Sequence, residues 1–183
     1  MNSIIACNLS SYRQYQESAY EHLSEIGLTN VEIRCPEPEN VGAVKAELDK
    51  YGLVATSVIV PCQMDADDVV MRFAWYLDTV SKLGVRYVFT SAKSGEIDRD
   101  YIHGRLQGIG DAAAERGITV GLETHPDLVT NGDIGLETMR GVVHPNVRIN
   151  FDTGNVFYYN RNVTSEGELA KIVDYVAMVH LKD

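Results

Sequence analysis

Residues 118–125 read Ile-Thr-Val-Gly-Leu-Glu-Thr-His, a short β-branched and apolar run that ends in polar, titratable side chains. Two similar runs follow, Val-Arg-Ile-Asn-Phe-Asp at 147–152 and Val-Ala-Met-Val-His-Leu at 176–181. Glu123, Asp152 and His180 are separated by 29 and 28 residues (152 − 123 and 180 − 152). Each separation is about the length of one strand–helix unit. The three side chains are therefore predicted to lie at the same height on three successive strands.

The same alternation extends outward over the whole chain. Short apolar runs alternate with longer helical stretches, which favours a parallel sheet in an α/β protein. The runs predict strands at 4–9, 31–35, 54–60, 87–90, 118–123, 147–152 and 176–181. The stretches between them predict helices at 13–26, 41–51, 66–83, 99–116, 134–142 and 165–174.

Capping residues support several of these boundaries. Glycines can take the left-handed conformation that ends a helix, and four of them closely follow helical stretches: Gly27, Gly52, Gly84 and Gly117. Asp65 and Ser165 are expected to cap the start of the third and the last helix. Because no linker, low-complexity tract or charge block divides the chain, we expect a single domain over residues 1–183.

Two architectures fit this alternation, a doubly wound sheet and a (β/α) barrel. A doubly wound sheet usually has a glycine-rich phosphate loop after its first strand, but residues 8–12 here read Asn-Leu-Ser-Ser-Tyr. Barrel enzymes carry polar residues at the carboxyl ends of their strands, as this chain does. We therefore predict an α/β fold, a parallel TIM barrel. A complete barrel takes about 250 residues, so the prediction is an incomplete one, C-terminally truncated, with about seven strands and the eighth missing.

Composition bears on which partners the protein can bind and in which cellular compartment it is expected. The formal net charge of −10 disfavours nucleic acid as a partner. No apolar run approaches the ~18 residues of a membrane span, and the start of the chain lacks the features of a signal peptide. We expect a cytoplasmic protein that binds no membrane. Cys7, Cys35 and Cys62 have no CxxC spacing, so neither a disulfide framework nor a zinc knuckle is indicated.

The three polar strand ends predict a metal site. Strand alternation places Glu123, Asp152 and His180 on the face opposite the apolar neighbours Leu122 and Phe151. One such residue alone is more often a loop cap or an ion-pair partner, but the three occur in register. Two converging carboxylates are costly to bury without a cation. Mixed oxygen and nitrogen ligation suits Mn²⁺, Co²⁺, Zn²⁺ or Mg²⁺ and leaves positions open for a substrate.

These motifs resemble a known family. "GLETHP" around Glu123, "FDTGN" around Asp152 and "HLKD" around His180 are similar to the xylose isomerase-like TIM-barrel superfamily, and the resemblance covers nearly the whole chain. The resemblance implies that these three residues hold one divalent ion together with a second Glu on an eighth strand, for which the chain has no counterpart. Many sugar epimerases of the superfamily also have a His where this chain has Asn155.

The resemblance implies a sugar or sugar-phosphate isomerase or epimerase of carbohydrate metabolism. Glu123 would be both metal ligand and catalytic residue, removing the proton α to a carbonyl through a metal-stabilised enediolate. Three of the expected substrate-binding residues have alternatives: a loop hydrogen bond for His125, an ion pair with a site carboxylate for Lys182 and an ion pair with Arg34 for Glu32. The full expected set is His125, Asn155, Lys182 and Glu32.

The sequence also allows three other functions. An inosose-type dehydratase would start with the same proton abstraction and then lose a hydroxide. An enzyme like endonuclease IV is disfavoured because the third and fourth strand ends, at 60–63 and 90–93, offer no His for a zinc cluster. A non-catalytic barrel remnant is the last. Its open first and seventh strands would invite pairing with another chain, so we expect a homodimer if residue 183 is the natural end.

Overall fold

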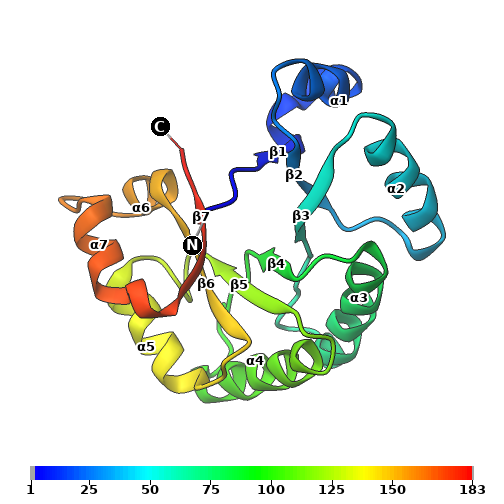
Figure 1. The fold of residues 1–183 in the computed structure, drawn as a ribbon. Coiled ribbons are helices and arrows are strands. Elements are labelled where there is room, and N and C mark those ends of the chain that lie inside the picture. The colour runs from blue at the N-terminus through cyan, green and yellow to red at the C-terminus, as the bar shows by residue number, and fades with distance from the viewer. Residues whose placement is uncertain (1–2, 183) are drawn as a thin grey trace.

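The protein is described by a computed structural model that covers residues 3–182. Its seven strands form one sheet in which neighbours in sequence are neighbours in space, all paired in parallel (Figure 1). The strands are β1 (Cys7–Asn8), β2 (Asn30–Arg34), β3 (Val54–Ile59), β4 (Tyr87–Thr90), β5 (Thr119–Glu123), β6 (Val147–Asp152) and β7 (Val176–His180).

The sheet curls into an arc, and the helices lie around its outside (Figure 1). They are α1 (Gln16–Glu25), α2 (Val41–Lys50), α3 (Val69–Leu83), α4 (Arg99–Ala114), α5 (Gly132–Val142), α6 (Thr153–Tyr159) and α7 (Ser165–Ile172), with short 3₁₀ segments η1 (Leu9–Tyr15), η2 (Pro38–Asn40) and η3 (Val173–Tyr175). Within residues 3–182, β1 and β7 are the two ends of the sheet and do not pair with each other. The predicted incomplete TIM barrel is confirmed as a curled half-barrel of seven parallel strands.

The core lies between the convex side of the sheet and its helices. Helix α3 shows how the sequence builds it, because Phe73, Leu77 and Val80 follow one another at helical spacing and are at most 1% exposed. From the sheet, Leu122 and Phe151 point outward under the helices and are equally buried. The apolar members of each strand thus anchor it, and its polar members are left for the concave side.

The start of the chain departs from the predicted strand at 4–9. Strand β1 has only two residues, because the side chain of Asn8 accepts a hydrogen bond from the Ser10 amide at 2.9 Å and starts the 3₁₀ segment η1. This local hydrogen bond competes with the sheet ladder. The structure also contains a helix that the sequence pattern does not predict, α6, which follows β6 without a loop.

The predicted C-caps are confirmed, but the two predicted N-caps are wrong. Helix-ending glycines 27, 52, 84 and 117 have φ values of +77°, +67°, +80° and +63°. Helix α3 begins only at Val69, four residues after Asp65, because residues 64–68 form turns. At α7 the cap is Thr164 rather than Ser165, and its hydroxyl accepts from the Gly167 amide at 3.1 Å.

One side of β7 is uncovered in the described residues. Strand alternation would turn Val179 and Leu181 toward covering helices, but their side chains are 45% and 83% exposed. Helices α6 and α7 both precede β7 in the chain. Helix α7 packs on α5 and α6, and the contact of α6 with β7 leaves these two side chains exposed. None of the helices within residues 3–182 combines the length and apolar character needed to cross a bilayer.

Candidate metal centre

The carboxyl ends of β5, β6 and β7 bring the three predicted ligands together. Sheet register pairs Asp152 directly with His180 and places Glu123 one strand further along. The imidazole Nδ1 of His180 lies 3.3 Å from Glu123 Oε1 and 3.6 Å from Asp152 Oδ2. One potential ligand atom from each residue falls within 4.8 Å of the others. Two oxygens and one nitrogen thus converge on a single point.

Asp152 is the most deeply buried of the three, with no exposed surface. Its Oδ1 accepts hydrogen bonds from the amides of Gly154 at 3.0 Å and Asn155 at 2.9 Å, which starts helix α6. Its Oδ2 points the other way and accepts no hydrogen bond of good geometry from the described residues, although the Lys182 ammonium contacts it. A buried carboxylate oxygen without a hydrogen bond is costly unless a cation faces it.

Glu123 is held by the strand on its other side. Its Oε2 accepts a hydrogen bond from the hydroxyl of Ser91, which directly follows β4, and its Oε1 faces His180. Burial opposes ionisation of Glu123, but the hydrogen bonds from His180 and Ser91 outweigh it and hold the pKa of the carboxyl below its ordinary value. Glu123 is therefore an ionised, oriented carboxylate.

Charge is the dominant interaction in the cluster. Burial opposes the charged form of Asp152, but contacts with His180 and Lys182 prevail and lower its pKa to about 2. Burial likewise opposes protonation of His180, but its contacts with the carboxylates of Asp152, Glu123 and Glu32 raise its pKa to about 11. The carboxylates of the cluster thus form ion pairs with a protonated imidazole, that of His180, and with the ammonium of Lys182. The site fits a divalent cation, since its donors are those of a mixed oxygen–nitrogen centre and its charge demands a counter-ion.

Glu32 reaches the same site from β2, across the concave side of the sheet. It is 6% exposed, and its Oε1 lies 3.0 Å from His180 Nε2. The expected alternative, a Glu32–Arg34 pair, is not formed, because Arg34 is exposed and its Nε lies 3.4 Å from the Ser10 hydroxyl. Glu32 is therefore a partner of His180 and not of Arg34.

Lys182 and Asn155 lie at the rim. The Lys182 ammonium pairs with Asp152 and lies 4.0 Å from Glu123 Oε1, which is the ion-pair alternative expected from the sequence. Its side chain is still 48% exposed. Asn155 donates from Nδ2 to the carbonyl of Thr124 at 2.9 Å, and its Oδ1 faces Lys182 Nζ at 3.5 Å. Asn155 is thus a fixed amide, and Lys182 has room to move.

His125, an expected substrate-binding residue, makes the alternative loop hydrogen bond. It lies two residues beyond the end of the strand, where the chain has turned into a loop, and Nδ1 is 3.2 Å from the Pro126 carbonyl. Its Nε2 instead meets the hydroxyl of Tyr159, the last residue of α6, at 2.9 Å. His125 therefore forms a pair with Tyr159 rather than joining the three ligands.

Sequence reasoning missed several neighbours of the site. Ser91, Asn150, Phe89 and Tyr159 all contact residues of the cluster or its rim, and the Phe89 ring meets the His180 ring edge-on at 4.6 Å. A usable signal exists for Asn150, which alternation puts on the same face as Asp152, and for Ser91, which follows a strand end. Tyr159 has none, because the sequence pattern does not predict its helix.

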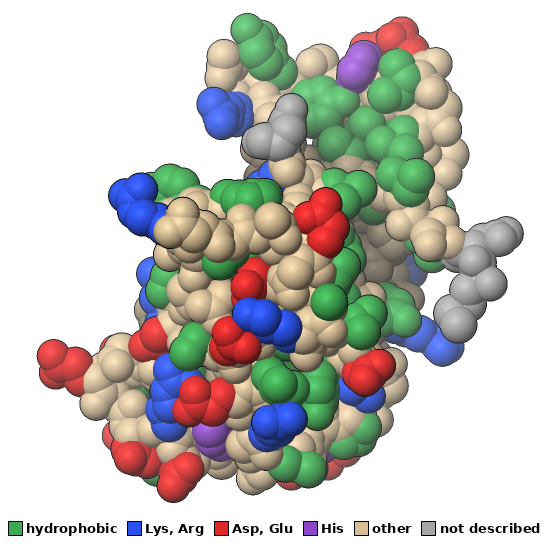
Figure 2. Space-filling model, turned by 90° about the vertical axis from the view of Figure 1, so that its left-hand side faces the viewer, with side chains coloured by type: hydrophobic (Ala, Val, Ile, Leu, Met, Phe, Trp, Pro, Cys, Tyr) green, Lys and Arg blue, Asp and Glu red, His purple; other side chains and the backbone are tan. Residues whose placement is uncertain are grey.

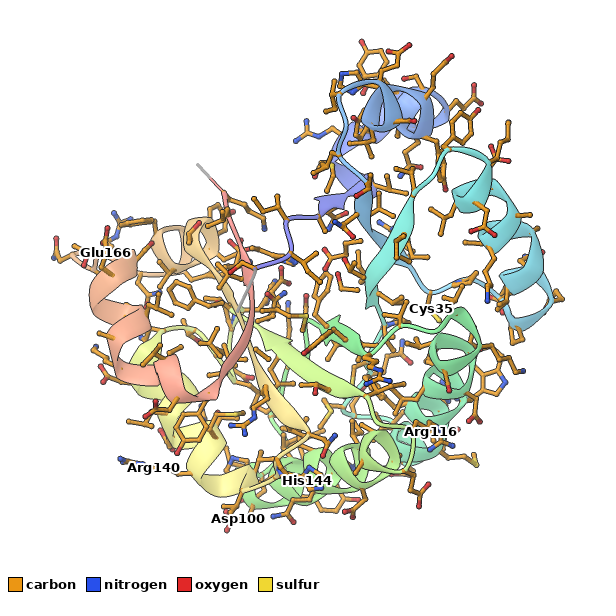
Figure 3. All side chains as sticks on the ribbon, in the orientation of Figure 1. Cys35, Asp100, Arg116, Arg140, His144 and Glu166 are labelled. Atoms are coloured by element: carbon orange, nitrogen blue, oxygen red, sulfur yellow. The ribbon has the colours of Figure 1, made fainter. Side chains whose placement is uncertain are left out.

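Other reactive groups lie outside this cluster. His144 contacts Asp111 at 3.3 Å on the outer rim, near α4 and α5 (Figure 3). The three cysteines are free thiols. Burial raises the pKa of Cys35 to about 11 and that of Cys62 to about 12, so neither provides a thiolate nucleophile near neutral pH.

Comparison with known proteins agrees with this architecture. The family model described as xylose isomerase-like TIM barrel matches residues 20–183. No curated protein matches the chain by sequence.

Solved structures with a similar fold include three informative ones. A probable 3-DHS dehydratase from Bacillus anthracis has a TM-score of 0.82 and 18% identity, covering 99% of this chain and 73% of that one. A xylose isomerase-like TIM-barrel protein from Mycobacterium smegmatis, in complex with magnesium, has a TM-score of 0.81 and 18% identity, covering 100% of this chain and 77% of that one. A D-psicose 3-epimerase from Clostridium cellulolyticum H10 has a TM-score of 0.75 and 16% identity, covering 96% of this chain and 71% of that one. At these identities the likeness shows the fold alone.

Proposed function

Because the chain belongs to the xylose isomerase-like TIM-barrel family, we propose that it is a divalent-metal-dependent isomerase or epimerase of a sugar or sugar phosphate. The observation that carries this proposal is the convergence of Glu123, Asp152 and His180 at the carboxyl ends of adjacent strands. This is the end at which barrel enzymes place their active sites. The D-psicose 3-epimerase among the proteins of similar structure supports the same class.

The residues present would divide the chemistry between them. Glu123, Asp152 and His180 would hold the cation, which when bound supplies positive charge for an oxygen that becomes negative during the reaction. Glu123 is the proton-transfer group, because it is ionised and its Oε1 lies between His180 Nδ1, at 3.3 Å, and the half-exposed ammonium of Lys182, at 4.0 Å. Its task is to take the proton from the carbon next to the substrate carbonyl.

The rim residues suit a polyhydroxylated substrate. Lys182 is half-exposed and can leave Asp152 to neutralise an enediolate or contact a phosphate. Asn155 is anchored through its Nδ2, and its Oδ1, which accepts from Lys182 at 3.5 Å, has a second lone pair to accept from a sugar hydroxyl. An amide has no basic nitrogen, so Asn155 binds and orients but does not transfer protons.

The metal is tested first. The purified protein, treated with a chelator and then titrated with Mn²⁺, Co²⁺, Mg²⁺ or Zn²⁺ in a calorimeter, should bind one ion per chain. Absence of binding with all four ions would rule the proposal out.

The reaction class is tested next in D₂O. The metal-loaded protein is incubated with a panel of ketoses, aldoses and their phosphates and followed by proton NMR. An isomerase or epimerase should exchange the C–H next to the carbonyl for deuterium and retain the substrate's composition. A panel that shows neither exchange nor product, with metal bound, would contradict the proposed activity while leaving the metal centre intact.

The His125–Tyr159 pair favours a second candidate, a dehydratase. Loss of water after proton abstraction needs an acid that protonates the departing hydroxide, and the imidazole and phenol lie 2.9 Å apart at the rim. The similar protein from Bacillus anthracis is a probable dehydratase, which supports the same reaction class. In the D₂O experiment a dehydratase would release water and give an unsaturated product, which separates the two candidates.

A further inference from the structure

The imidazole of His180 has carboxylates on both of its nitrogens. Nδ1 faces Glu123 and Asp152, whereas Nε2 points away from them and meets Glu32 Oε1 at 3.0 Å. Strands β2 and β7 are not neighbours in the sheet. The contact therefore spans the concave side of the half-barrel.

Glu32 is itself fixed by other strands. The Asn8 amide donates from Nδ2 to Oε1 at 2.8 Å, and the Ser57 hydroxyl donates to Oε2 at 2.6 Å. These partners come from β1 and β3, the two strands that flank β2. With 6% exposure and donors on both oxygens, the carboxylate has little freedom to turn. It is a rigid acceptor that faces one ring nitrogen of His180.

Asn150 is the other group near this nitrogen, and it cannot take the same role. Its Nδ2 lies 3.1 Å from Nε2 and 3.3 Å from Nδ1. An atom almost equidistant from both nitrogens cannot lie along the in-plane direction of either, because those directions diverge. An amide NH₂ also donates and does not accept, so it cannot receive an imidazole proton.

Glu32 is also poorly situated to be a metal ligand. The group of side chains whose ligand atoms converge within 4.8 Å comprises Glu123, Asp152 and His180. Glu32 faces the opposite nitrogen of the imidazole, so the ring stands between it and that convergence point.

We propose that Glu32 is a positioning residue: it accepts a hydrogen bond from the Nε2–H of His180, so that Nδ1 presents its lone pair to the cation. This rests on the metal centre of the proposed function and adds to it the residue that sets the histidine tautomer. A carboxylate behind a ligating histidine orients the ring and makes the other nitrogen a better ligand. Glu32 thus acts through His180, and the residues at the rim, Lys182 and Asn155, contact the substrate.

The first test compares two buried carboxylates. Glu32→Ala should weaken Mn²⁺ binding by about 10- to 100-fold in calorimetry, the usual effect of losing such a partner. Glu168→Ala is the matched control, because Glu168 is also 6% exposed and hydrogen-bonded, but to the Gly132 amide and Lys171 at a distance from the site. That variant should keep the wild-type affinity. An equal loss in both variants would identify a purely structural role and overturn the proposal.

The second test reads the tautomer and does not depend on a stable alanine variant. In the Zn²⁺-loaded wild-type protein, nitrogen-15 NMR should show His180 protonated at Nε2 and metal-bound at Nδ1. Glu32→Gln keeps an acceptor oxygen and should lose less affinity than Glu32→Ala. A spectrum with Nε2 on the metal, in a protein that does bind it, would overturn the role of Glu32 but not the proposed function. Failure of the wild-type protein to bind any metal would overturn both.

Discussion

At the scale of single residues, Asp152 serves two purposes with its two oxygens. Oδ1 caps helix α6, and Oδ2 faces His180 and Lys182 in the cluster. The helix therefore begins at the site, and the cap fixes the carboxylate with one oxygen turned inward. A side chain that retained only the capping oxygen would separate the two roles.

We predict that Asp152→Asn separates them, because asparagine caps helices about as well as aspartate but offers no anionic ligand. Metal affinity should fall by more than about 100-fold, beyond the loss caused by outer partners. Asp152→Ala should lose the same affinity and also be about 1 kcal/mol less stable than Asp152→Asn. Calorimetry and urea unfolding of the metal-free proteins measure the two effects. Wild-type affinity in the Asn variant would contradict a ligand role for Asp152.

The sequence predicts some residues of the site better than others, and the reason is geometric. Spacing and alternation suffice to bring Glu123, Asp152 and His180 to the carboxyl ends of adjacent strands, although Glu123 pairs with Asn150 and the β6–β7 register shifts next to Ile149. The contact from Glu32 to His180 depends instead on how far the sheet curls, which no local pattern encodes. The same holds for His125, whose orientation depends on a loop.

At the scale of elements, one aspartate joins the loops after β4 and β5. Asp127 Oδ1 accepts from the Ser94 amide at 2.7 Å, and Oδ2 accepts from the Ser94 hydroxyl at 2.6 Å and the Gly95 amide at 3.0 Å. Burial opposes its ionisation, but these hydrogen bonds outweigh burial and hold the pKa of Asp127 below its ordinary value. The loops that carry Ser91 and His125 at their start are thus tied together by a charge.

We predict a pH-dependent effect of Asp127→Asn. Since the folded pKa is lowered, the ionised carboxylate stabilises the protein above the unfolded value of about 4 and loses this effect as pH falls through the folded pKa. The variant should be about 1–2 kcal/mol less stable than wild type at pH 7, and the difference should shrink at about pH 3, below the unfolded value. Urea unfolding at both pH values measures it. A difference that stays constant would contradict the role of the charge.

Helices α4 and α5 are joined by a reciprocal contact of histidine on glycine. The His144 ring, just after α5, covers Gly110 of α4, and the His103 ring of α4 covers Gly141 of α5. A Cβ atom at either glycine would overlap the facing imidazole. The glycines are therefore required by close approach of the two elements.

We predict opposite signs for two substitutions in the same helix. Gly110→Ala should lower the free energy of unfolding by about 1–3 kcal/mol, as overpacking does. Gly104→Ala, at a position with no atom within 4 Å of the added Cβ, should raise it by about 0.5–1 kcal/mol, because alanine is the better helix former. Thermal or urea unfolding separates the two. A stabilising Gly110→Ala would contradict the tight contact.

Periodicity predicts long elements well and short ones poorly. Helix α3 is predicted because its apolar stripe repeats along the whole helix. Helix α6 has seven residues and one buried side chain, Val156, so it has no stripe to detect. The pattern overestimates strand β1, because Ile4 and Ile5 are β-branched but 68% and 73% exposed, and the Asn8 turn ends the ladder.

At the scale of the whole molecule, the half-barrel has charges of both signs on its surface. Figure 2 shows acidic and basic side chains close together on the face it presents, with hydrophobic side chains between them. The net charge of −10 is therefore not spread evenly over the surface that Figure 2 shows. At physiological salt, screening acts over about 8 Å, so repulsion between two copies is weak and does not prevent apolar contacts.

The apolar contact that we expect two copies to make is at the outer edge of β7. Within the described residues β7 pairs with β6 on one side and its other edge is open, which favours pairing with another chain. The Val179 side chain, on the outer face of the same strand, is 45% exposed. If residue 183 is the natural end of the chain, we predict that the protein self-associates and that Val179→Lys, a charge on an edge strand, shifts it to the monomer. Val173→Lys is the matched control, because Val173 is 56% exposed but lies in η3, outside the strand.

Light scattering over a range of concentrations measures both variants against wild type. A wild-type mass that stays monomeric throughout would contradict association, and an equal effect of the two lysines would assign it to charge rather than to the β7 edge. Because Val179 points away from the concave side that holds His180, Val179→Lys should also keep metal affinity. Retained affinity in a monomeric variant would mean that one copy supplies every ligand.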